Sequence, residues 1–101
     1  MTTVSTLSEL DGKPHAQVFP DAEPKTVRLT LAAGESVPAH THPGRRIVCY
    51  LRTGRLDLTV GAETTTLTEG DVARFSGEKK IAPTAVEDSV ALLVLASAAD
   101  G

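Results

Sequence analysis

The chain has 101 residues, of which 41% are hydrophobic and 23% charged, and its formal net charge is −3. This length predicts a single domain with an ordinary globular composition, and the absence of a basic face argues against a nucleic-acid partner. The longest apolar run, residues 90–96, is too short to span a bilayer, so no membrane partner is expected. One cysteine and no visible signal peptide favour a cytoplasmic protein in a reducing compartment.

The first half of the chain contains the earliest strand signals. Residues 5–10 could form one helical turn, and a short strand is expected around His15. Residues 27–32 alternate between apolar and polar side chains, with Val27 on the apolar face. A period of two is typical of a strand with one buried face.

The second half adds three more strands. Residues 47–51 and 90–96 are apolar throughout, which predicts strands buried on both faces. Residues 55–60 alternate, and Gly61-Ala62 after them suits a two-residue hairpin loop. Short strands separated by turn residues predict an all-β sandwich or barrel. The expected core comprises Leu29, Leu31, Val48, Leu51, Leu56, Leu93 and Leu95.

The spacing of glycines and histidines is more specific. Gly34 is followed after five residues by His40, one residue later by His42, and then by Gly54. This pattern resembles the first conserved motif of the cupins, and the Gly-Asp pair in "LTEGDVARFSGEKKIAP", residues 67–83, is similar to part of their second motif. The resemblance covers most of the chain.

The resemblance implies an all-β, single-domain cupin jelly roll, a double-stranded β-helix barrel in which two sheets enclose a pocket. It implies one domain over residues 1–101, with a core of about 25–96 and an N-terminal strand or arm over 1–24. His40 and His42 would lie side by side on one strand and face this pocket.

The metal ligands of the cupin motif are only partly retained. In metal-binding cupins, two histidines, a glutamate and a third histidine surround one divalent ion. Here the glutamate position falls on Ile47, and the third histidine falls near Lys80 or Ile81. His40 and His42 are therefore the candidate metal ligands, for zinc, nickel, iron or manganese, and a further ligand would have to come from elsewhere.

Several residues outside the motif could supply that further ligand. His15 is the only other histidine, and Glu78, Glu87 and Asp88 are the carboxylate candidates. Cys49 could face the same pocket, although a lone buried cysteine is more often a small apolar filler.

Three hypotheses for the histidine pair remain open. The pair could form a weak or altered metal site, it could bind a small organic acid together with Arg46 or Arg74, or it could be structural. The corresponding function is a small cupin of unassigned activity that binds a divalent metal or small molecule. The alternative is a metal-dependent cupin enzyme of the dioxygenase or isomerase type, which the missing ligands disfavour.

A homodimer is also expected. The strand around His15 and the strand at 90–96 offer more apolar surface than so small a barrel readily covers, and exposed edge strands need a partner.

Overall fold

The computed structural model describes residues 2–98. Its elements in chain order are the 3₁₀ helix η1 (Leu7–Glu9) and the strands β1 (His15–Gln17), β2 (Lys25–Leu31), β3 (Arg45–Thr53), β4 (Arg55–Val60), β5 (Glu63–Thr68), β6 (Val72–Ser76), β7 (Ile81–Ala85) and β8 (Ser89–Ser97). No helix in this part of the chain is long and apolar enough to cross a membrane.

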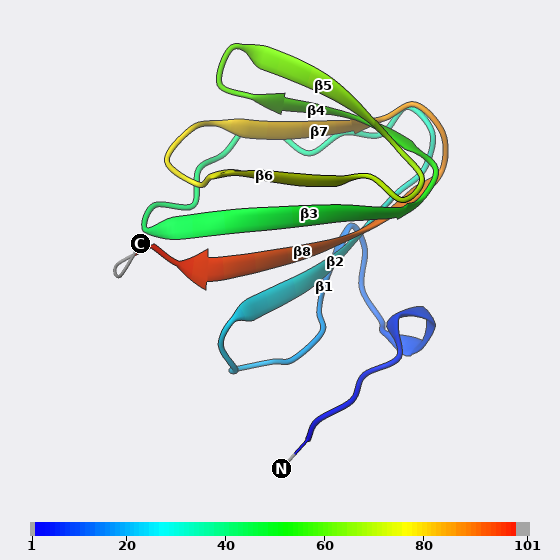
Figure 1. The fold of residues 1–101 in the computed structure, drawn as a ribbon. Coiled ribbons are helices and arrows are strands. Elements are labelled where there is room, and N and C mark those ends of the chain that lie inside the picture. Colours follow the sequence, from blue (N-terminus) through cyan, green and yellow to red (C-terminus); the bar gives the residue numbers. More distant parts are fainter. Residues whose placement is uncertain (1, 99–101) are drawn as a thin grey trace.

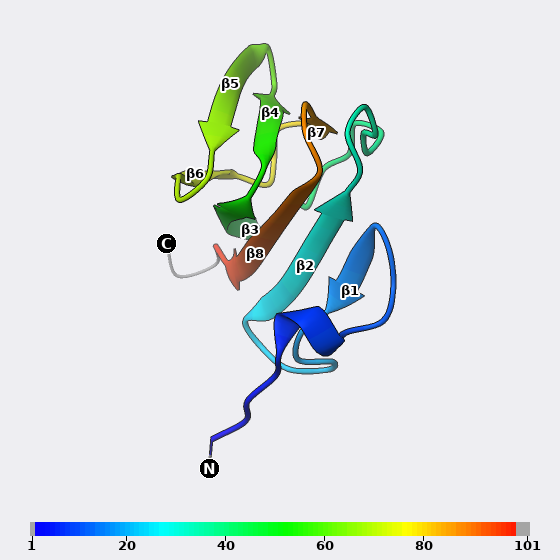
Figure 2. The same cartoon turned by 90° about the vertical axis from the view of Figure 1, so that its right-hand side faces the viewer.

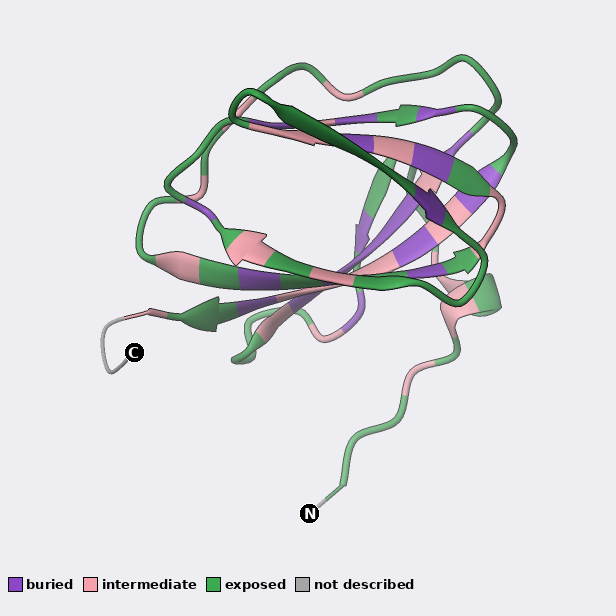
Figure 3. Ribbon diagram, turned by 45° about the horizontal axis from the view of Figure 1, so that its top comes forward, coloured by how far each residue is buried: buried purple, intermediate pink, exposed green. Residues whose placement is uncertain are grey.

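The strands form two antiparallel sheets that face each other (Figure 1). The larger sheet has the order β1-β2-β8-β3-β6, and the smaller has the order β5-β4-β7. Residues of both sheets are buried where the sheets face each other (Figure 3), and they form one hydrophobic core cluster. The expected all-β jelly roll is confirmed.

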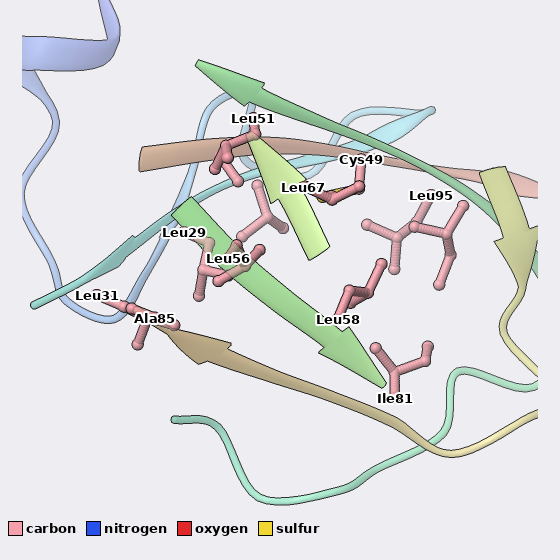
Figure 4. Packing of buried hydrophobic residues seen from close by; sticks show 13 residues of the cluster. Leu29, Leu31, Cys49, Leu51, Leu56, Leu58, Leu67, Ile81, Ala85 and Leu95 are labelled. Atoms are coloured by element: carbon pink, nitrogen blue, oxygen red, sulfur yellow. The ribbon is translucent and has the colours of Figure 1, made fainter. Parts of the chain in front are cut away.

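Alternation along each strand decides which side chains reach the interior. Ile47, Cys49 and Leu51 of β3 are buried, and Leu56 and Leu58 of β4 approach them from the opposite sheet (Figure 4). In β2 and β4, the side chains that point inward are the apolar ones that the alternation in the sequence predicted.

The prediction that residues 47–51 are buried on both faces is wrong. Val48 and Tyr50 point away from the barrel and are each 38% exposed, because no second layer formed by residues 2–98 covers the outer face of β3. Val48 therefore does not belong to the core. The other expected core positions are buried, except that Leu93 is only partly buried.

Local turns follow the sequence signals. Val60 pairs with Glu63, so Gly61-Ala62 is a two-residue hairpin loop, as expected, and Gly61 has a φ of 63°. Such a positive φ suits glycine, which has no side chain to clash with the backbone.

The later part of the N-terminal arm, residues 7–14, lies against the outer side of the larger sheet (Figure 2). Arg28 of β2 is only 7% exposed, and its guanidinium donates hydrogen bonds to the backbone carbonyls of Leu7, Leu10 and Gly12. Its Nε has no hydrogen-bond partner among the described residues. Arg28 thus holds the arm through backbone oxygens rather than through a carboxylate.

Candidate functional site

A cavity of about 550 Å³ lies between the two sheets. Most of its wall is apolar and comes from strands of both sheets. Leu58 and Ile81 of the smaller sheet face Leu95 of the larger sheet across it (Figure 4). The volume is within the usual range for small-molecule sites, which are commonly apolar with a few polar groups.

His40 and His42 both line this cavity. They lie in the segment 36–44 between β2 and β3, which runs beside β7 but forms no named strand. The expected strand is reduced to two isolated bridges to β7, Ser36 with Thr84 and His40 with Ile81. In the second bridge the backbones exchange hydrogen bonds of 3.1 and 2.7 Å. The segment is then closed by a turn in which Arg45 N donates to His42 O at 3.2 Å.

The two imidazole rings are neighbours, as the sequence predicted. Their centroids are 4.8 Å apart, and the rings are nearly perpendicular, at 88°. The Nδ1 of His40 lies 2.8 Å from the carbonyl oxygen of Pro38. Because a carbonyl oxygen can only accept a hydrogen bond, Nδ1 carries the proton, and Nε2 is the nitrogen of His40 left for a ligand.

Three further polar residues from the start of the chain line the same cavity. His15 and Gln17 come from β1, and Lys25 begins β2. His15 lies at the solvent-facing edge, because it lines the cavity although the residue is exposed. Sequence reasoning missed Lys25, although it has the same parity along its strand as the buried Val27.

These groups are close enough to affect one another's protonation. Burial lowers the pKa of His42, and repulsion from His40, Lys25, His15 and Arg45 lowers it further. Burial also lowers the pKa of His15, with repulsion from His40 and Lys25 as smaller causes. The structure therefore brings the three histidines and Lys25 to one side of the cavity.

The carboxylate candidates do not join them. Glu78 accepts a 2.6 Å hydrogen bond from Gly44 N, and Asp88 accepts one of 2.9 Å from Ala33 N. Neither these residues nor Glu87 line the cavity, and the same is true of Arg46 and Arg74.

The donor set does not fit the four-ligand metal site of the cupin motif. Ile47 occupies the glutamate position, is 1% exposed and belongs to the apolar wall, as does Ile81 near the position of the third histidine. Within residues 2–98, no group of three His, Cys, Asp or Glu side chains is arranged to hold a metal ion. The histidine pair is the part of the motif that remains.

Cys49 also lines the cavity, but it is fully buried. Burial raises the pKa of its thiol to about 11. A protonated, buried thiol is a poor metal ligand and nucleophile, so Cys49 acts as an apolar filler.

A two-sheet antiparallel barrel with a central ligand-sized cavity defines a jelly roll of the double-stranded β-helix class. A family model described as Cupin domain matches residues 27–96. The chain therefore belongs to the cupin family. No curated protein matches the sequence.

Solved structures share this fold. A conserved protein of unknown function from Streptococcus pyogenes is 23% identical, with a TM-score of 0.73, over 82% of this chain and 72% of that one. An RmlC-like cupin from Shewanella frigidimarina is 15% identical, with a TM-score of 0.79, over 99% and 95% of the two chains. A predicted oxalate decarboxylase from Thermotoga maritima is 17% identical, with a TM-score of 0.80, over 94% and 99%. At these identities the likeness concerns the fold alone.

Proposed function

We propose that this cupin, whose activity is unassigned, binds a small molecule in the barrel cavity, with His40 and His42 contacting the ligand. The observation that carries the proposal is the cavity of about 550 Å³, whose apolar wall is interrupted by two adjacent imidazoles. Polar groups placed on an apolar wall orient a bound molecule and give specificity.

The proposal is tested by screening a library of neutral, cationic and anionic small molecules by NMR on the full chain. We expect at least one class to bind saturably and to shift the ring resonances of His40 and His42. The same ligand should bind less tightly to the His40→Ala/His42→Ala variant. If no class binds saturably to a folded protein, the proposed function is wrong.

Metal binding by the histidine pair is the second candidate. It is favoured by the hydrogen bond from His40 Nδ1 to Pro38, which fixes the ring and leaves Nε2 as a donor atom. The enzyme alternative, of the dioxygenase or isomerase type, depends on such a metal. His15 lines the same side of the cavity, but among residues 2–98 it does not form a three-ligand group with the pair, so the remaining ligands would have to be water or the bound molecule.

Metal binding is tested by titrating the metal-free protein with zinc, nickel, iron(II) and manganese. Two imidazoles without the motif glutamate should give only modest affinity, weakening as pH falls below about 6.5. The His40→Ala/His42→Ala variant should lose this uptake and remain folded, because the apolar core does not include either ring. Equal uptake by wild type and variant would exclude the pair as ligands.

We further propose a cytoplasmic location, a homodimer and a single domain with its core over residues 25–96. The single, buried cysteine is compatible with a reducing compartment.

A further inference from the structure

We propose that the ligand is an amphipathic anion, with a carboxylate bound at the polar side of the cavity and an apolar body inside the barrel. The inference rests on the proposed function and names the ligand class of that same site. Its basis is the distribution of polar and apolar groups around the cavity.

The polar groups of the wall come from facing edges of the two layers. β1 is the edge strand of the larger sheet and supplies His15 and Gln17. The segment 36–44 runs beside β7, at the edge of the smaller sheet, and supplies His40 and His42. A ligand head group between these edges would contact side chains from both.

These groups can donate hydrogen bonds to an anion. Lys25 has three N–H donors and a positive charge, Gln17 has an amide N–H₂, and His15 and His42 each have a ring N–H even when neutral. His40 differs, because its Nδ1 already bonds to Pro38, and it donates to a ligand only when Nε2 is protonated. Charge-assisted hydrogen bonds to carboxylates are the stronger ones among these.

No aspartate or glutamate of the described chain lines the cavity. Glu23, which lies near Lys25 in sequence and interacts with it electrostatically, is engaged elsewhere. Its carboxylate pairs with Arg45 through contacts of 2.7 and 3.2 Å. The positive charge of Lys25 is therefore not neutralised by a carboxylate within the wall.

The rest of the wall excludes a uniformly polar ligand. It comprises aliphatic side chains, Phe75 and the buried thiol of Cys49, with Ile47 buried where a charged group would be needed for a metal. Hydroxyl groups placed against such a wall would lose their hydrogen bonds to water without compensation. When an alkyl or aryl body binds there, apolar surface of both the ligand and the cavity wall is removed from water, which favours binding.

The test uses three probes with the same chain and different head groups: octanoate, 1-octanol and octylamine. Isothermal titration calorimetry on the full chain should show octanoate binding at least about tenfold more tightly than 1-octanol, with octylamine weakest. Acetate, which has the charge without the apolar body, should bind weakly or not at all. Lys25→Met should weaken octanoate binding about tenfold and leave 1-octanol unchanged. Lys80→Met, at an exposed lysine outside the cavity, is the matched control and should change neither.

The outcomes separate the ligand class from the proposed function. If 1-octanol binds as well as octanoate, or if Lys25→Met has no more effect than Lys80→Met, the anion class is wrong although the cavity still binds small molecules. If none of the three probes binds while a polar or metal ligand does, the apolar body is wrong. Selective octanoate binding that depends on Lys25 supports the inference.

Discussion

His15 and His42 link the chemistry of the cavity to the stability of the fold. Both have a pKa held below the ordinary value of 6.5, chiefly by burial. The folded protein therefore binds these protons less readily than the unfolded chain does. The neutral form of these two histidines therefore stabilises the fold. Their contribution to the free energy of unfolding is fully present above pH 6.5, and it is lost as the pH falls from 6.5 through the lowered pKa that each has in the folded protein.

We expect the free energy of unfolding to decrease between about pH 7.5 and about pH 5. Urea denaturation across this range measures it. The variant His15→Asn/His42→Asn should show a weaker dependence, because neither replacement titrates. An unchanged pH dependence in this variant would show that other groups are responsible.

How far the sequence predicts the site depends on the kind of interaction at each residue. The histidine spacing identified His40 and His42 as pocket residues, and the same motif placed the apolar Ile47 at the glutamate position. Lys25 could have been found from its parity with Val27, but a lysine at a strand end is usually solvated. His15 was one candidate among several, since only the fold brings β1 next to the segment 36–44.

At the scale of elements, Gly77 determines where the histidine segment lies. Its carbonyl accepts a 2.7 Å hydrogen bond from His42 N, and its own N–H donates to Arg45 O at 2.8 Å. A Cβ on Gly77 would lie 2.2 Å from the carbonyl oxygen of His42. This position therefore has no room for a side chain unless the turn moves.

Gly77→Ala should displace the 42–45 turn, lower the free energy of unfolding by roughly 1–3 kcal/mol and weaken ligand binding. Urea denaturation and the NMR resonances of His42 measure the two effects. Gly34→Ala is the comparison, since its Cβ would meet nothing within 4 Å, although its φ of 87° makes alanine strained. That variant should lose stability without shifting His42. A His42 signal that is unchanged in Gly77→Ala would contradict this account.

Arg28 determines where the N-terminal arm lies, as Gly77 does for the histidine segment. Arg28→Met removes the donors to three backbone carbonyls, and we expect a loss of about 1–3 kcal/mol. Amide hydrogen exchange should accelerate at the short η1 turn, for example at Leu10 N. Arg74→Met, an exposed arginine on the same sheet, should have little effect. Equal exchange in both variants would mean that Arg28 does not hold the arm.

The sequence predicted the positions of strands more reliably than it predicted which of their faces are covered and which segments they pair with. The periods of β2 and β4 gave their inward faces correctly, because alternation is a local property of the backbone. The period did not reveal that Thr26 and Arg28, on the outer face of β2, are buried as well. The apolar run of β3 gave the wrong result for Val48 and Tyr50, because a run of apolar residues does not reveal whether a second layer covers its outer face. The segment 36–44 forms two isolated bridges instead of a strand, since its pairing depends on β7, more than thirty residues away in sequence.

At the scale of the whole molecule, the outer face of the larger sheet carries an apolar patch. Val48, Tyr50 and Val72 are exposed, and Tyr50 pairs across the sheet with both Val72 and Leu92. Contiguous exposed apolar side chains commonly mark an interface. This patch is the surface through which we expect the homodimer to form.

Light scattering at tens of micromolar should give twice the mass of one chain. Tyr50→Glu/Val72→Glu should give a monomer, because two buried unpaired charges per subunit would oppose association. Val86→Glu, at an exposed apolar residue in the turn after β7, is the control and should leave the dimer intact. A wild-type mass equal to one chain would exclude the dimer at that concentration.

The cavity is built from two parts of the chain with different relations to the cupin family. The matched residues 27–96 contain His40, His42 and most of the apolar wall, whereas His15, Gln17 and Lys25 precede them. The barrel is thus the part that this chain shares with the family, whereas β1 and the first residue of β2 add polar groups that lie outside the family match. Replacing His15, Gln17 and Lys25 should therefore change which ligand head group the cavity accepts and leave the barrel itself unaltered.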